Sequence, residues 1–149
     1  MLLYSLVSLL LVAAPSTDGW ATYSNARYGY SIGVPPGLVG QGESENGDGQ
    51  QFQDASGKVR LRVWASHKME DDERRTYLES WREQGIRVTY QPRGKGWWVL
   101  SGEDKEGRIL YLKQLEKNGV LYSFEWSHPK GAKTWQDTTA RIARGFSLP

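Results

Sequence analysis

An alternation of apolar with polar residues, with a period of two, runs through much of this chain. Between Val59 and Ala65 every second residue is apolar. The same period recurs at 86–91 and at 120–127. This period indicates β-strands that bury one face. The segments 97–101 and 108–115 are rich in β-forming residues but apolar on both faces, which predicts central strands covered on both sides at least in part.

Glycine-containing turns separate these strand segments. Asn118-Gly119 lies between two of them and is a strong hairpin signal, because both residues accept positive φ. Gly94 and Gly107 mark the two preceding turns. The segment from Ile86 to His128 is therefore expected to form an antiparallel meander of four strands.

Two segments carry a helical spacing of apolar residues instead. The first extends from about Glu70 to Gln84: its start is acidic, as the helix dipole favours, and Gly85 follows its end. The second extends from about Trp135 to Arg144, and Thr134 and Asp137 are expected to form an approximate capping box at its start.

Strands and helices in this order predict one α+β domain, an antiparallel β-sheet of about six to eight strands with two helices packed on it. The alternation also predicts which side chains form the core. The sheet is expected to contribute Val59, Leu61, Val63, Val88, Tyr122, Phe124 and Trp126. The helical side chains expected to cover them are Tyr77, Leu78, Trp81 and Ile142.

The N-terminus predicts export. The run from Leu2 to Ala14 has the length of the apolar part of a signal peptide, and it is shorter than the roughly 20 residues that span a bilayer. We expect residues 1–16 to be a signal peptide cleaved after Ser16, with cleavage after Ala21 as the alternative. The remainder would be a single domain, 17–149, that is periplasmic or secreted and has no stable membrane insertion. No Lys or Arg precedes the run, so a buried N-terminal helix or strand and a retained, uncleaved anchor are the competing interpretations.

The balance of charges argues against polyanionic partners. The chain has 19 basic and 17 acidic residues, a net charge of +2, without a long basic block. This balance is too even to indicate binding to nucleic acid or to an anionic membrane. The absence of cysteine excludes disulfides, thiol catalysis and Cys-ligated zinc.

The opening of the predicted domain resembles a known family. The stretch YSNARYGYSIGVPPGL, residues 23–38, is similar to the start of PsbP/Mog1/DcrB-like domains, with a short strand, an aromatic-Gly-aromatic step, a second strand and a Pro-Gly turn. The resemblance implies an antiparallel sheet with helices packed on it. It further implies an accessory, chaperone or binding protein rather than an enzyme, and it carries no catalytic residue over to this chain.

An acidic, glycine-rich loop follows at 43–49. Ser44, Asn46, Asp48 and Gly49 match the first, third, fifth and sixth positions of an EF-hand loop. Ala55 stands where that loop needs a bidentate glutamate, so the three oxygen donors are weak calcium candidates. We expect a solvated turn, no bound metal and no cofactor.

Catalytic constellations are weak in this sequence. His67 and His128 are the two histidines, and each lies at the boundary of a predicted element, where a structural role is favoured over catalysis. Trp97 and Trp98 are adjacent in a strand and must point to opposite faces, so they cannot form one sugar-stacking platform. We therefore expect a noncatalytic protein.

The candidate partner-binding residues lie on polar strand faces and in the acidic loop. Arg60, Arg62 and Trp64 share one face of their strand, and arginine and tryptophan are enriched at binding hot spots. The competing interpretation is cross-strand ion pairing, for example with Glu125, beneath a covering loop. The full candidate set is Glu43, Glu45, Asp48, Arg60, Arg62, Trp64 and Arg87.

These expectations lead to one functional hypothesis. The protein is expected to be an exported accessory or binding protein that recognises a protein or a cell-envelope component. An envelope hydrolase with an unrecognised site, or an immunity protein against a periplasmic toxin, are the alternatives.

Overall fold

The computed structural model describes residues 17–69, 71–131 and 133–149. The expected signal peptide at 1–16 lies outside these residues. The elements are β1 (Ala21–Ser24), β2 (Ser31–Val34), β3 (Val39–Glu43), β4 (Gly49–Gln53), β5 (Arg60–His67), α1 (Glu73–Glu83), β6 (Arg87–Tyr90), β7 (Arg93–Gly94), β8 (Trp97–Glu103), β9 (Arg108–Lys117), β10 (Val120–Pro129) and α2 (Thr134–Arg144). No helix among the described residues is long and apolar enough to cross a membrane.

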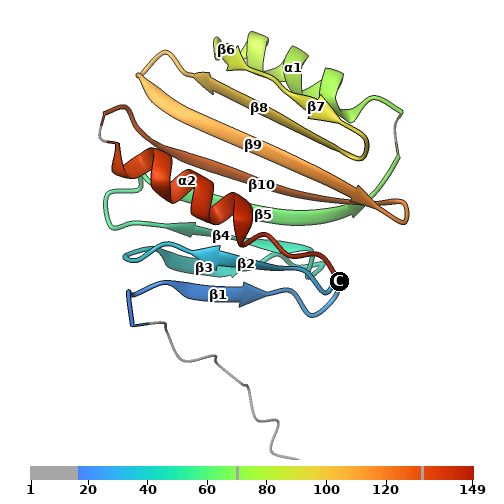
Figure 1. Ribbon diagram of the computed structural model, residues 1–149, viewed down its shortest axis with the longest axis horizontal. Helices are drawn as coiled ribbons and strands as arrows, with labels where there is room; N and C mark the ends of the chain where they lie inside the picture. The colour runs from blue at the N-terminus through green and yellow to red at the C-terminus, as the bar shows by residue number, and fades with distance from the viewer. Residues whose placement is uncertain (1–16, 70, 132) are drawn as a thin grey trace, which may run out of the picture.

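Eight strands form one antiparallel sheet in the order β3-β4-β5-β10-β9-β8-β6, with β7 paired to β8 (Figure 1). The strands β1 and β2 form a separate hairpin. The expected meander is confirmed, since β6, β8, β9 and β10 are neighbours in this order. The turn between β9 and β10 has positive φ at Asn118 and Gly119, 52° and 75°, as the hairpin signal predicted. The α+β class with two helices on an antiparallel sheet is therefore confirmed.

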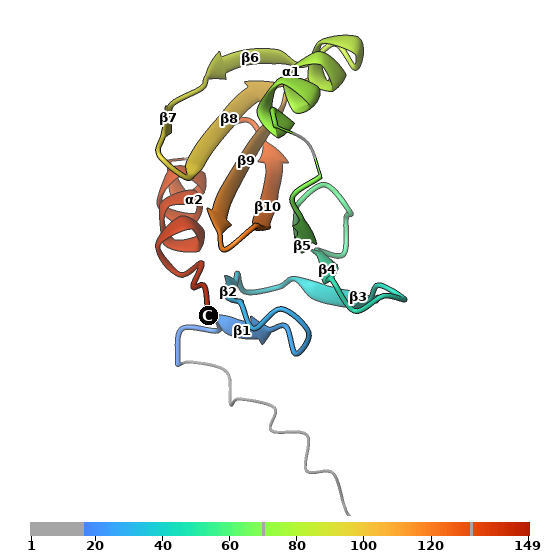
Figure 2. The ribbon, with the colours of Figure 1, turned by 90° about the vertical axis from the view of Figure 1, so that its right-hand side faces the viewer.

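The two helices cover opposite faces of the sheet (Figure 2). On one face, α2 and the β1–β2 hairpin enclose a cluster of buried residues. Its members include Val59, Leu61, Val63, Tyr122, Phe124, Trp126 and Ile142, all of which the alternation placed in the core.

The second cluster lies under α1 on the other face. Trp81 is buried there with Leu100 and Leu112, and the part-buried residues packed against them are Trp64, Tyr77, Leu78 and Val88. The expectation that Tyr77, Leu78 and Trp81 cover the first core, with Val88 in it, is therefore wrong. Because β8 and β9 are apolar on both faces, their sequences do not indicate which helix covers which side.

Both helix starts differ from the sequence prediction. Helix α1 begins at Glu73 rather than near Glu70, because the side chain of Asp72 caps it by accepting a hydrogen bond from Arg75 N at 3.0 Å. At α2 the expected capping box is absent. Thr134 is already helical, and the N-cap residue Lys133 makes no side-chain capping bond. A residue inside the helix cannot serve as its cap, since capping requires non-helical dihedrals.

A segment near the start of the described domain and a segment near its end meet in one β-bridge. Ser31 in β2 and Ser147 exchange backbone N–H···O bonds, each of 2.9 Å. Tyr30 and Phe146, the neighbours of these serines, are buried edge-to-face with ring centroids 6.0 Å apart.

Candidate functional site

The predicted polar face of β5 is present and open in part. Arg60 and Arg62 are exposed, whereas Leu61 and Val63 on the opposite face are buried. The guanidinium of Arg62 lies 4.8 Å from the centroid of the Trp64 ring and 3.8 Å from the Glu125 carboxylate. The predicted pair with Glu125 therefore forms, but no loop covers it: the Arg62 side chain is 52% exposed. An ion pair this exposed contributes little to stability.

A basic cleft extends this face toward the end of the sheet. Arg60 and Arg108 line both a cavity of about 100 Å³, with Arg62 and Glu125, and an adjoining cavity of about 610 Å³ where turns of the sheet meet. The charged residues lining the two cavities are Lys58, Arg60, Arg62, Arg108 and Lys130, with the carboxylates of Glu106 and Glu125. Cations therefore outnumber carboxylates in the lining. We call the group of the exposed Arg60 and Arg62 and the half-buried Trp64 and Arg108 the arginine face.

Arg60 is the least compensated cation of this face. Its Nε donates to the Gly57 carbonyl at 2.6 Å, and none of the described carboxylates pairs with it. Arg108 differs, since its Nε lies 3.2 Å from Asp104 Oδ2. Burial alone would raise the pKa of Asp104, but hydrogen bonds, including those from the backbone and side chain of Arg108, outweigh it and lower that pKa.

The acidic loop is anchored rather than free. Hydroxyl and amide groups of the β1–β2 hairpin bind it: Tyr23 donates to Glu43 Oε1 at 2.7 Å, Asn25 to the Gly47 carbonyl at 2.8 Å and Tyr30 to the Asp48 carbonyl at 2.8 Å. Burial raises the pKa of the Tyr30 hydroxyl far above its usual range, so this donor keeps its proton. These three hydrogen bonds tie the loop to the hairpin.

The weak calcium candidates are engaged in the turn itself. Ser44 Oγ donates to Asn46 Oδ1 and Asp48 Oδ1 and also receives the backbone N–H of Asp48. Ala55, where the motif needs a bidentate glutamate, supplies no carboxylate. Among the described residues no cluster of three or more histidine or carboxylate side chains has the arrangement of a metal site.

The structure brings together part of the predicted partner-binding set. Asp48, Arg62 and Trp64 line a common cavity of about 470 Å³, and Arg60 adjoins it on β5. Glu45 is exposed on the same loop as Asp48, and Glu43 faces the hairpin through Tyr23. These positions join the acidic loop to the arginine face.

Arg87 does not belong to this surface. It lies on β6, with three strands between β6 and β5, and its guanidinium is 3.2 Å from Glu103. The strand register places Arg87 and Glu103 on the sheet face opposite to Arg60. The expectation that Arg87 shares one surface with Arg60, Arg62 and Trp64 is therefore wrong, because alternation assigns a face only within one strand; a role of Arg87 in binding stays a prediction.

The two histidines occupy packing positions. His128 is buried, and its ring stacks on Trp135 at a centroid distance of 4.9 Å. Burial lowers the pKa of this imidazole, which favours its neutral form. His67 is exposed, with its ring 5.9 Å from that of Tyr28.

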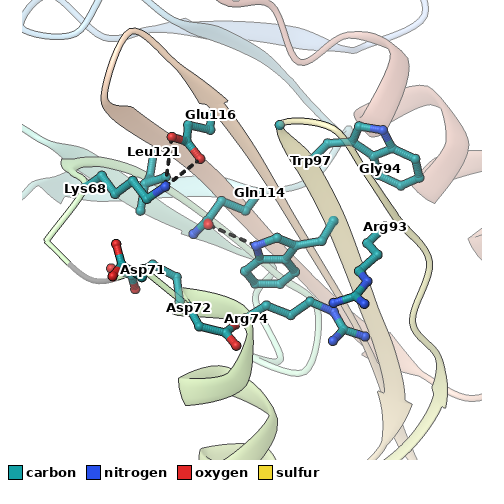
Figure 3. Close-up of a pocket in the computed structure, with 13 residues that line it drawn as sticks. Lys68, Asp71, Asp72, Arg74, Arg93, Gly94, Trp97, Gln114, Glu116 and Leu121 are labelled. Atoms are coloured by element: carbon teal, nitrogen blue, oxygen red, sulfur yellow. Dashed lines mark hydrogen bonds and ion pairs between the residues drawn. The ribbon is translucent and has the colours of Figure 1, made fainter.

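A second pocket was not predicted from the sequence (Figure 3). It has a volume of about 190 Å³ and lies between the start of α1 and the ends of β5, β8 and β9. Trp98 is 9% exposed and donates its indole N–H to Gln114 Oε1 at 3.0 Å, whereas Trp97 on the other face is 38% exposed. Charged residues from separate elements line it: Lys68, Asp71, Asp72, Glu73, Arg74, Arg93 and Glu116. Gln114 was the available signal, as a polar residue in a strand expected to be covered on both faces.

Comparison with solved structures identifies the fold. The solution structure of cyanobacterial PsbP (CyanoP) from Synechocystis sp. PCC 6803 matches with a TM-score of 0.63 and 17% sequence identity, covering 93% of this chain and 99% of that chain. A crystal structure from Bacteroides thetaiotaomicron VPI-5482 matches with a TM-score of 0.52 and 11% identity. It covers 89% of this chain, which spans 49% of that chain. No family model matches the sequence, and no curated protein matches it. The chain has a PsbP-like fold.

Proposed function

We propose that this chain is an exported, noncatalytic accessory protein that binds a protein of the cell envelope through its arginine face. The observation that carries the proposal is the basic cleft, in which five cationic side chains line two adjoining cavities beside only two carboxylates. A partner that presents acidic side chains would complement this charge, and complementary charge gives a complex its orientation and specificity.

The rigidity of the surface supports a recognition role. Arg60, Arg62 and Trp64 project from β5, which has a paired strand on each side. Side chains on a central strand lose less conformational freedom on binding than side chains on a mobile loop. Arginine and tryptophan are also the residue types that most often dominate binding energy at protein interfaces.

The noncatalytic part of the proposal rests on how the two histidines are used. His128 is enclosed by tryptophans and is biased toward its neutral form, so its ring serves packing. His67 lies against an aromatic ring at the end of β5, with no described carboxylate bound to it to orient its imidazole as a base.

Affinity capture with a matched control tests the proposal. The Arg60→Glu, Arg62→Glu double variant reverses two charges on the arginine face, and the Arg75→Glu, Arg82→Glu variant reverses two exposed arginines of α1 outside it. From solubilised envelope of the native cell, wild type and the α1 variant should retain a defined protein that cross-links to the arginine face. The face variant should lose it while keeping wild-type circular dichroism.

Two outcomes would contradict the proposal. Equal capture by both double variants would show that the arginine face is not the interface. Hydrolysis of peptidoglycan or peptide substrates by the purified protein, abolished by changing one histidine or carboxylate, would show that the protein is an enzyme.

A further inference from the structure

The pocket around Trp98 has opposite charges on its two sides. In Figure 3 Asp71 and Asp72 lie toward one side of the pocket, and the guanidinium groups of Arg74 and Arg93 lie toward the other. Lys68 and Glu116, at a third edge, neutralise each other in an ion pair of 3.1 Å. The pocket therefore has an acidic side and a basic side, and the Trp98 side chain belongs to its lining.

Among the described residues, the acidic and basic side chains of the two sides form no ion pair with one another. Within the described residues, neither the guanidinium of Arg93 nor the carboxylate of Asp71 has an ion-pair or hydrogen-bond partner. Arg74 donates from its terminal nitrogen to the Gln91 carbonyl and amide oxygens at 3.3 and 2.9 Å, both neutral acceptors, and its buried Nε has no partner. A guanidinium with an unsatisfied buried donor gains from a nearby anion, because leaving such a donor unpaired costs free energy.

The base of the pocket is polar and held in place. Gln114, which is buried, accepts from Trp98 and donates from Nε2 to Ser123 Oγ at 3.1 Å. These bonds fix both the indole and the amide. An amide oxygen and nitrogen each keep capacity for one more hydrogen bond, which suits a ligand with a peptide-like group.

We propose that this pocket binds a small zwitterion of the amino-acid type, a free amino acid or a dipeptide. Its carboxylate would lie toward Arg93 and Arg74, and its ammonium group toward Asp71 and Asp72. The volume of about 190 Å³ gives room for a small ligand of this class. The inference is independent of the proposed function, because no residue of the arginine face lines this pocket.

Nuclear magnetic resonance of the indole groups tests this site directly. The probes are L-alanine and L-alanyl-L-alanine, and Trp98→Phe identifies the indole N–H signal of Trp98. At about 10 mM probe, enough to detect millimolar affinity, that signal should shift with saturation for at least one of the two. A response to L-alanine alone assigns a free amino acid, and a stronger response to the dipeptide assigns a peptide.

Blocked ligands and variants test the two ends separately. N-acetyl-alanyl-alanine lacks the ammonium group, and alanyl-alanine amide lacks the carboxylate. The affinity of each should be at least about tenfold lower than that of alanyl-alanine, as the loss of a charged hydrogen bond predicts. Arg93→Gln should abolish discrimination between the dipeptide and its amide, and Asp71→Asn should abolish discrimination against the acetylated form. Arg82→Gln, at the other end of α1, should bind as wild type does.

The result that overturns the inference is also defined. Any one of three results contradicts it. The Trp98 signal does not shift with either zwitterion, or it shifts equally with the blocked forms. The third result is that Arg93→Gln and Asp71→Asn both bind as wild type does. Arg93 and Asp71 are exposed, so these substitutions leave the fold intact, and a wild-type spectrum outside the pocket verifies that.

Discussion

His128 shows how a single side chain can make the stability of this domain depend on pH. Its ring is enclosed by Trp126 and Trp135, and burial lowers its pKa. Above the unfolded-state pKa of about 6.5 the imidazole is neutral in both states and stability is complete. As pH falls below that value the unfolded chain takes up a proton that the folded chain resists, so the free energy of unfolding decreases until the folded pKa is passed.

The pH dependence is tested with matched histidine variants. His128→Phe keeps a ring against Trp135 but cannot titrate, so its urea-unfolding free energy should fall less than that of wild type between about pH 7.5 and 5.5. His67→Phe changes the exposed histidine and should retain the wild-type difference. An equal fall in wild type and His128→Phe would show that His128 is not the source.

At the scale of elements, the start of α1 depends on one carboxylate. Two aspartates precede the helix, and the side chain of Asp72, the second of them, accepts from Arg75 N. Asp72→Ala should lower the free energy of unfolding by about 1 kcal/mol, as the loss of an N-cap does. Asp71→Ala is the control and should change it by less than about 0.5 kcal/mol, as for an ordinary surface substitution. Chemical denaturation of the two variants compares them, and equal losses would contradict the assigned cap.

The elements also show where sequence reasoning reaches its limit. Alternation correctly assigned the buried and exposed faces of β5, because Arg60 and Arg62 alternate with Leu61 and Val63. It could not place α1 or Arg87, because relating β6 to β5 requires the register of the three strands between them. The Trp98 pocket was missed for a similar reason. Lys68 follows β5, whereas Arg93 and Gln114 belong to β7 and β9, so the three residues meet only once the sheet has formed.

At the scale of the whole molecule, the sheet separates two hydrophobic clusters, each closed by its own helix. The N-terminal segment belongs to the α2 side. Asp18 forms an ion pair with Arg141, whose guanidinium also lies 4.2 Å from the Trp20 ring centroid. These contacts favour cleavage after Ser16, because cleavage after Ala21 would remove both partners of Arg141.

The mature N-terminus is therefore a further prediction. Mass spectrometry of protein released from the periplasm or the medium should show a chain that begins at Thr17. A chain beginning at Thr22 would show that the contacts of Arg141 are dispensable. Full-length protein confined to the cytosol would contradict export itself.

The bridge between Ser31 and Ser147 has a consequence for biosynthesis. Ribosomes release a chain from its N-terminus onward, yet the strand that begins at Ser31 finds this partner only at Ser147, beyond every other strand of the described domain. Until Phe146 has emerged, Tyr30 lacks one of the rings against which it packs. The nascent domain therefore stays incompletely packed through most of its synthesis, and the export that we propose would act on the chain in that state.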